Sequence, residues 1–251
     1  MGPGGVPKRN TPGNHSLSGV GIVAALVAEA RAFGSTTERR GVPLTLPDGT
    51  LLIVSGIGRA AASDAAQTLV KAGATALASF GLAGGLDPTL AAGTIVLPGE
   101  VISTQKLTFQ TSPEWRARVE AALPKGSPVT RDRLLASSSA IAGIEAKATA
   151  FRDSGACAVD MESLGIAQMA AKYSLPFLVA RVIVDTATDE LPKSVMTATD
   201  SGRVRVLRLL TGLVRRPADV IAVIRLGQRY RLAIRSLQSV AAMPPLHQVA
   251  A

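Results

Sequence analysis

The chain has 251 residues, of which 47% are hydrophobic and 18% are charged, a composition that supports a packed core and excludes global disorder. Its one cysteine, Cys157, excludes an intramolecular disulfide, and its two histidines, His15 and His247, lie near the chain ends, which argues against a Ser-His-Asp triad, a Cys-His pair or a multi-histidine metal site. The net charge of +9 is concentrated in residues 201–251, where nine arginines stand against Asp219, so the rest of the chain is nearly neutral and does not resemble a nucleic-acid binder. Acid–base chemistry must therefore come from carboxylates.

The N-terminal segment combines a polar leader with a short apolar run. Residues 1–18 are rich in Gly, Pro, Asn and Ser and are expected to be a disordered leader. Lys8 and Arg9, followed by the apolar run Val20–Val27, imitate a signal peptide. Because the run is short and contains Gly21, a first buried strand that leads into a helix is the favoured interpretation.

Alternating strands and helices follow in the first half of the chain. The patterns predict strands over 43–46 and 51–54 joined by a Pro-Asp-Gly turn, a helix over Arg59–Lys71, a strand over Thr75–Phe80 and a small-residue loop over Gly81–Gly85. A strand is expected over Thr94–Ile102 and a helix over Pro113–Leu123.

The second half continues the alternation. A short strand over Ala156–Val159 leads into a helix over Met161–Tyr173, and Pro176–Val184 is an apolar run with one arginine, typical of a strand covered on both faces. The alternation predicts a single α/β domain with a mixed, largely parallel central sheet flanked by helices.

The C-terminal segment predicts one long amphipathic helix from about Pro217 to Ala242. Its apolar arc comprises Leu226, Tyr230, Ala233, Leu237 and Val240. Its arginine arc, on the opposite side, comprises Arg225, Arg229, Arg231 and Arg235. Packing of the apolar arc on the body and contact of the helix with an anionic membrane both remain open.

A glycine motif follows the strand over 51–54. Gly56, Gly58 and Arg59 open the next helix in a GxGxxA pattern typical of dinucleotide sites, but the acidic residue expected about 20 positions later is absent. A tight strand-to-helix turn is favoured over nicotinamide binding. The bare N–H groups at the helix start are also candidates for binding a phosphate or another anion.

Four carboxylates lie near expected strand ends, where ligands gather in parallel sheets. Glu29 begins a helix, Asp160 and Glu162 flank Met161 at the start of another, and Asp185 follows the buried strand directly. Each can be a helix cap or a surface residue. Their joint placement instead favours a pocket that holds a sugar and delivers a proton.

Several segments in the correct order resemble the purine nucleoside phosphorylase and methylthioadenosine/adenosylhomocysteine nucleosidase superfamily. They are GIVAALVAEARAF, VSGIGRAAA, GLAGGLDPTLAAGTIVLPGEV and AVDMESLGIAQMAAKYSLPFLVARVIVD. The resemblance implies a nucleoside phosphorylase-like domain over 19–215 and a basic helical arm over 216–251. The arginine-rich tail resembles the hopanoid-associated branch, which is thought to remove adenine from adenosylhopane.

The resemblance also implies roles for individual residues. Asp185 matches the aspartate that protonates purine N7, and Glu29 matches the glutamate that orients the attacking water. Glu162 matches the glutamate that binds the ribose hydroxyls, and Met161 matches the methionine that packs on the sugar. Asp160 replaces a family glutamate and is a shorter substrate-binding carboxylate, with Ala83 and Gly84 in the adjoining loop.

Departures from the family motifs remove polar groups from the expected pocket. Leu82 and Val184 stand where the nucleosidases have serines, and Ala140 stands where an aromatic residue often faces the base. These changes imply a larger, more apolar pocket. They favour a bulky apolar substituent on the nucleoside, while a methylthioadenosine-type nucleosidase and a non-catalytic nucleoside-binding module remain alternatives.

The remaining expectations concern the nucleophile and the partners. Glu29 indicates water, whereas the branch indicates phosphate as a co-substrate, bound by Gly56, Gly58 and Arg59. No metal, other cofactor or nucleic acid is expected. A homodimer or higher homo-oligomer is expected in the cytoplasm, and the sequence leaves open a peripheral contact with the inner face of a membrane through the arm.

Overall fold

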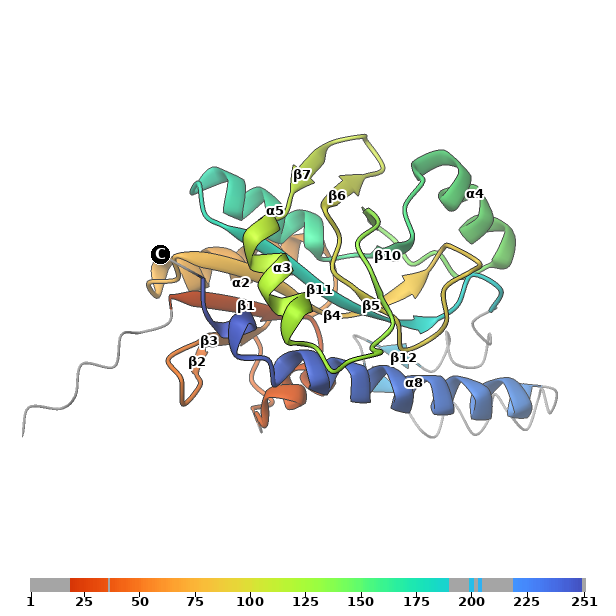
Figure 1. Cartoon of the computed structure of the whole chain (residues 1–251), viewed down its shortest axis with the longest axis horizontal. Helices are drawn as coiled ribbons and strands as arrows, with labels where there is room; N and C mark the ends of the chain where they lie inside the picture. The colour runs from red at the N-terminus through yellow and green to blue at the C-terminus, as the bar shows by residue number, and fades with distance from the viewer. Residues whose placement is uncertain (1–18, 36, 190–198, 201–202, 205–218, 250–251) are drawn as a thin grey trace, which may run out of the picture.

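The computed structural model describes residues 19–35, 37–189, 199–200, 203–204 and 219–249. In this part of the chain, eleven strands form one mixed sheet with helices on both faces (Figure 1), so the predicted fold class is confirmed. The predicted leader and the predicted helix start at Pro217 lie outside the described residues.

The strands of the sheet are β1 (Val20–Ala24), β2 (Leu44–Thr45), β3 (Leu51–Val54), β4 (Ala76–Gly85), β5 (Ile95–Val96), β6 (Glu100–Ser103), β7 (Thr108–Gln110), β8 (Val129–Thr130), β9 (Leu134–Ala136), β10 (Ala158–Asp160) and β11 (Phe177–Asp185). The helices are α1 (Val27–Ala30), α2 (Arg59–Lys71), α3 (Pro113–Ala122), α4 (Ile144–Ser154), α5 (Ser163–Lys172) and α8 (Asp219–Ala241). Short 3₁₀ turns cover Arg31–Phe33 and Pro244–His247, and β12 (Thr199–Asp200) pairs with β13 (Arg203–Val204).

Strand pairing brings the carboxyl ends of three long strands together. β1 is parallel to β3 and β4, and β11 is parallel to β4 on the opposite side from β1. The last part of β4 also pairs antiparallel with β10, which places Val159 opposite Gly84. The end of β4 therefore lies between the start of β10 and the end of β11.

The two faces of the sheet carry separate apolar cores. On one face α2 and α5 pack together, with Ala66 and Leu69 in the same buried cluster as Ile166. On the other face Trp115 of α3 and Leu237 of α8 belong to a second cluster. Both cores are built mainly from aliphatic side chains and alanine, as expected from the low aromatic content, with a few aromatics such as Trp115, Phe80 and Phe177.

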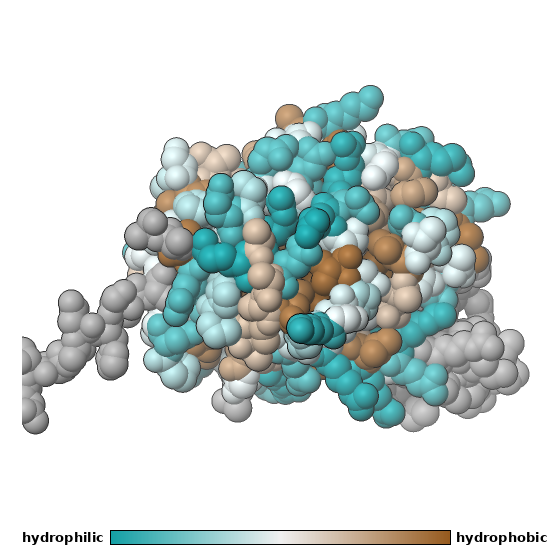
Figure 2. Space-filling view, in the orientation of Figure 1, coloured by the Kyte–Doolittle hydropathy of each residue, from teal (hydrophilic) through white to brown (hydrophobic). Residues whose placement is uncertain are grey.

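The described part of the C-terminal arm is built into the second core. Ala233, Leu237 and Val240 are buried, whereas Arg231 and Arg235 face solvent. Figure 1 shows α8 running along one side of the body, and Figure 2 shows hydrophilic residues along that edge. Three residues of the predicted apolar arc therefore pack on the body, whereas Tyr230 of the same arc is 37% exposed.

Two predicted elements differ from those observed. The segment Gly81–Gly85, predicted as a loop, is the second half of β4, because β11 and β10 both supply pairing partners beyond Phe80. The predicted strand Thr94–Ile102 is divided into β5 and β6 by Leu97, Pro98 and Gly99, since proline has no N–H for the ladder. Helix α4 was not predicted.

Candidate active site

A cavity of about 370 Å³ lies at the carboxyl ends of β1, β4, β10 and β11. Its described lining combines four carboxylates with small and apolar side chains: Glu29, Asp160, Glu162 and Asp185, together with Ala25, Leu26, Ile57, Leu82, Ala83, Gly84, Ser139, Ala140, Ile141, Val159, Met161 and Val184. All the catalytic and substrate-binding residues predicted from the sequence are therefore brought together in one place. Other residues of the lining were not predicted as site residues, among them Ala25, Leu26, Ser139, Ile141 and Val159.

Glu29 is held at the end of β1 by backbone N–H groups. Its Oε2 accepts hydrogen bonds from the N–H groups of Ala25 and Leu26, both at 2.9 Å, and its Oε1 accepts one from Leu82 at 2.9 Å. Its side chain is 2% exposed. Burial raises the pKa of Glu29 above its ordinary value, against the lowering effect of Arg181. The carboxylate is thus fixed in place and is a stronger base than an ordinary glutamate.

Asp160 lies at the end of β10 and caps α5. It accepts hydrogen bonds from the N–H and hydroxyl groups of Ser163, and its Oδ2 lies 2.8 Å from an Arg181 guanidinium nitrogen. These contacts occupy the carboxylate with structural partners. The helix-capping interpretation therefore applies to Asp160, although the residue also lines the cavity.

Glu162 lies at the start of α5 and joins this helix to the glycine motif before α2. Its Oε1 accepts a hydrogen bond from the N–H of Gly58 at 2.8 Å, and its Oε2 lies 3.5 Å from Arg181. Burial raises the pKa of Glu162 to about 7, with Arg181 opposing and Asp160 adding to the rise. Its carboxyl group therefore titrates close to neutral pH.

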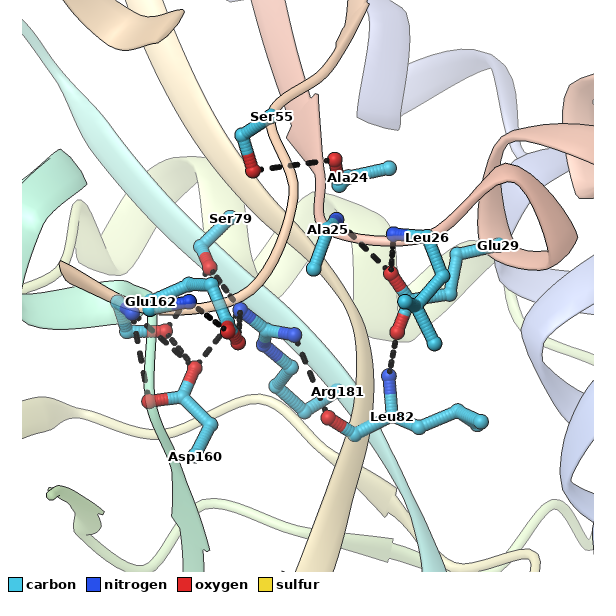
Figure 3. A network of polar contacts seen from close by, with 12 residues as sticks. Ala24, Ala25, Leu26, Glu29, Ser55, Ser79, Leu82, Asp160, Glu162 and Arg181 are labelled. Atoms are coloured by element: carbon cyan, nitrogen blue, oxygen red, sulfur yellow. Dashed lines mark hydrogen bonds and ion pairs between the residues drawn. The ribbon is translucent and has the colours of Figure 1, made fainter. Parts of the chain in front are cut away.

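Arg181 of β11 connects these groups, and sequence reasoning missed it. Figure 3 shows its guanidinium between Asp160, Glu162 and the backbone around Leu82. The side chain is 1% exposed, and it also donates a hydrogen bond to the Ser79 hydroxyl at 2.8 Å. A lone arginine in an apolar strand was the available signal, because a buried cation requires carboxylate partners.

Gly81 leaves the space that Glu29 and Arg181 occupy. A Cβ atom at this position would lie 2.4 Å from Glu29 Oε1 and 2.7 Å from Arg181 Nη1. The absence of a side chain at Gly81 therefore allows an acid and a cation to approach the backbone of β4 closely.

Asp185 ends β11 and also lines the cavity. The register between β11 and β4 shifts between Ile183 and Asp185, so that Asp185 lies opposite Gly84. Its Oδ2 accepts a hydrogen bond from Lys147 Nζ at 2.5 Å, and Lys147 is fully buried. Burial raises the pKa of Asp185, and the lysine opposes this rise. Lys147 is a second residue that sequence reasoning missed.

The candidate phosphate-binding residues are not arranged as one anion site. The N–H of Gly58 is used by Glu162, and Arg59 Nε donates to Gln168 Oε1 at 3.0 Å on the exposed surface between α2 and α5. Neither Gly56 nor Arg59 is among the described residues that line the cavity. The helical position of Arg59 turns its side chain toward α5.

The described residues contain no group of three His, Cys, Asp or Glu side chains arranged to hold a metal ion. Within the same residues, no helix combines the length and hydrophobicity needed to cross a membrane.

The fold and the cavity together define an α/β protein whose site holds carboxylates at the ends of parallel strands. A sequence profile of the phosphorylase superfamily matches residues 20–215. The chain therefore belongs to the phosphorylase superfamily, and the protein is an enzyme of the nucleoside phosphorylase and nucleosidase class.

Solved structures share this fold at low sequence identity. The 5′-methylthioadenosine/S-adenosylhomocysteine nucleosidase of Neisseria meningitidis, in complex with methylthio-immucillin-A, is similar with a TM-score of 0.64 and 18% identity over 88% of this chain and 96% of that chain. The futalosine hydrolase of Helicobacter pylori strain 26695 is similar with a TM-score of 0.63 and 15% identity over 90% of this chain and 98% of that chain.

Proposed function

We propose that this enzyme cleaves the N-glycosidic bond of an adenosine-type nucleoside and releases adenine. The observation that carries the proposal is that one cavity is lined by carboxyl groups with two different cationic partners. Asp185 bonds to Lys147, whereas Glu162 pairs with Arg181. A nucleoside in the cavity would place its base toward Asp185 and its sugar toward Glu162.

The residue types suit the charges that develop in this reaction. As the C–N bond breaks, its electron pair goes to the purine and positive charge develops on the ribose. Asp185 delivers a proton to the purine, a kind of assistance typically worth about 10²–10⁴-fold. A carboxylate such as Glu162 strengthens its hydrogen bonds to the sugar hydroxyls as the positive charge grows.

Water is the nucleophile that we favour over phosphate. The described lining of the cavity contains no arginine or lysine. A phosphate dianion needs cationic or N–H partners, whereas a water molecule needs a base such as Glu29. The hydroxide part of the water adds to the ribose, and its proton passes to Glu29.

The nucleoside is proposed to carry a bulky apolar 5′ substituent, with adenosylhopane as the specific candidate. The cavity wall includes Leu82, Val184, Ile57 and Ile141, and Ile57 is 44% exposed. Apolar walls favour burial of an apolar group. Methylthioadenosine, the ligand of a related bacterial nucleosidase, is the smaller alternative.

Adenine release from adenosylhopane, methylthioadenosine and adenosine, with and without phosphate, tests the proposal. We expect adenine release without phosphate and a ribose product that carries a hydroxyl group at C1. Among the three substrates, adenosylhopane should have the highest kcat/KM. Glu29→Gln should lose about 10²–10⁴-fold in kcat, whereas Glu114→Gln, on the exposed side of α3, should retain full activity. Product that carries phosphate at C1 would contradict hydrolysis, and no adenine from any substrate would contradict the function.

A further inference from the structure

Helix α4 is attached to the body in an unusual way. Lys147 is its one residue with a fully buried side chain, and the other described residues of α4 are partly or fully exposed. A buried lysine in place of an apolar residue costs free energy of folding unless its charge is fully compensated. Its partners therefore indicate why the lysine is there.

Each N–H group of the Lys147 ammonium has an acceptor. Nζ lies 2.5 Å from Asp185 Oδ2, 2.7 Å from the carbonyl of Thr186 and 3.2 Å from the carbonyl of Asp189. An ammonium group has three donors, and these three acceptors match them in number. The ammonium thus lies between the carboxylate and the turn that follows it.

The turn that supplies the two carbonyls is itself fixed. Asp189 Oδ2 accepts hydrogen bonds from the N–H of Thr186 at 2.8 Å and from its hydroxyl at 2.7 Å. Arg229 of α8 forms an ion pair with the same aspartate. The position of the Lys147 ammonium is therefore defined by α4, by β11 and by α8.

Asp185 Oδ2 accepts a hydrogen bond from Lys147. Within the described residues, Oδ1 has no side-chain hydrogen-bond partner. Gly84 lies beside both oxygens, where a Cβ would be 3.5 Å from each. We propose that Lys147 is a positioning residue for Asp185: it holds Oδ2 against the cavity wall, leaves Oδ1 free for the purine, and stabilises the carboxylate that forms when the proton leaves. This inference rests on the proposed function of Asp185 as the acid.

The proton balance of this step involves one donor. The O–H bond of Asp185 breaks, an N–H bond forms on the purine, and the electron pair of the glycosidic bond goes to the purine. Lys147 keeps its protons throughout. Because its positive charge interacts more favourably with the carboxylate than with the carboxylic acid, it lowers the barrier for proton transfer.

Removal of Lys147 should shift the pH dependence of catalysis in a definite direction. Lys147 lowers the pKa of Asp185 against the larger effect of burial. Without the lysine, the pKa of Asp185 rises further, and the acid stays protonated to higher pH. The charged groups around Asp185 are Lys147 on α4, Asp189 with its partner Arg229 on α8, and the other carboxyl groups of the cavity lining, Glu29, Asp160 and Glu162.

Steady-state kinetics of Lys147→Met across pH test the inference. We expect kcat to fall about 10- to 100-fold, KM to change by only a few fold, and the basic limb of the kcat profile to move to higher pH. Lys147→Gln, which keeps hydrogen-bonding atoms without the charge, gives the same readout if the methionine variant does not fold. Lys172→Met is the matched control, since this lysine lies over the Tyr173 ring at the end of α5.

A double-mutant cycle with Asp185→Asn separates the inference from the function. If Lys147 acts through Asp185, its substitution should have little further effect on the residual activity of the Asp185→Asn variant. An unmoved basic limb, or an equal loss in both backgrounds, would overturn the positioning role and leave the proposed function intact. Full activity of Asp185→Asn alone would overturn the role of Asp185, and the inference with it.

Discussion

The buried charges around Arg181 make the protonation state of the site sensitive to pH. One guanidinium cannot fully neutralise Glu29, Asp160 and Glu162 in a region from which water is excluded. At least one carboxyl group is then inclined to hold a proton near neutral pH. Such a group can accept or release a proton during turnover without leaving its hydrogen-bond partners.

The pH dependence of stability should reveal this titration at Glu162. The pKa of Glu162 is raised from 4.5 to about 7, so the folded protein holds this proton more tightly than the unfolded chain. The resulting stabilisation is present below the unfolded pKa and is lost as pH rises through the folded pKa. The free energy of unfolding should fall over this window, and the fall should be shallower in Glu162→Gln.

Urea titrations at several pH values within the window measure these slopes. Glu114→Gln, an exposed carboxyl group on α3, should keep the wild-type slope. A wild-type slope in Glu162→Gln would show that the titrating group lies elsewhere.

Gly81 offers a second test at the same scale. Gly81→Ala adds a Cβ that would lie 2.4 Å from Glu29 Oε1, so the carboxylate must move away from the N–H groups that hold it. We expect kcat to fall by more than about 10-fold and stability to fall by about 1–3 kcal/mol. The control is Gly143→Ala, where nothing lies within 4 Å of the added atom. Equal kcat values for the two variants would contradict the proposed crowding.

Among the elements, α8 contributes buried side chains to the apolar core on one face of the sheet. Leu237 is fully buried in the same cluster as Trp115, whose indole N–H donates to the carbonyl of Pro245 at 2.7 Å. His247 adds a hydrogen bond to the Thr50 hydroxyl at 3.1 Å. The segment after α8 is thus connected to α3 and to the turn between β2 and β3.

Truncation of Leu237 should therefore be costly. Leu237→Ala removes a fully buried side chain and should lower the free energy of unfolding by about 2–5 kcal/mol. Leu232→Ala, one and a half turns away on the same helix and 49% exposed, should lose less than half as much. Chemical denaturation of both variants gives the comparison, and equal losses would mean that α8 does not depend on its buried face.

Sequence patterns predicted the elements that have a regular apolar period and missed those that do not. The bounds of α2 were predicted correctly because its alanines and leucines recur at helical spacing. Helix α4 was missed because its one fully buried side chain belongs to Lys147. The strand nature of Gly81–Gly85 was missed because it depends on pairing with β10 and β11. The carboxylates of the cavity were found, but Arg181 was not, since its partners come from distant segments.

At the scale of the whole molecule, part of the basic charge lies beyond the matched family region, where five arginines stand against Asp219. Because Ala233, Leu237 and Val240 of α8 are buried, a contact with membranes would depend on exposed arginines such as Arg231 and Arg235. Such a contact is electrostatic, worth about 1 kcal/mol for each arginine near an anionic surface, and is screened by salt.

Vesicle co-sedimentation of the full chain tests this contact. We expect binding to vesicles that contain anionic lipid, no binding to neutral vesicles, and weaker binding at higher salt. Arg231→Gln with Arg235→Gln should weaken binding by about 10-fold or more, and Gln238→Ala on the same helix should not. Salt-independent binding by the double variant would contradict an electrostatic contact.

The packing of α8 also has a practical consequence for anyone who produces this protein. The profile match ends at residue 215, yet Leu237, Val240 and Leu246, which lie after it, are fully or almost fully buried. An expression plasmid that stops at the family boundary would leave Trp115 and the adjoining sheet face without their cover, and such surfaces promote aggregation. Clones for crystallisation should therefore extend through His247, and an affinity tag is better placed at the other terminus.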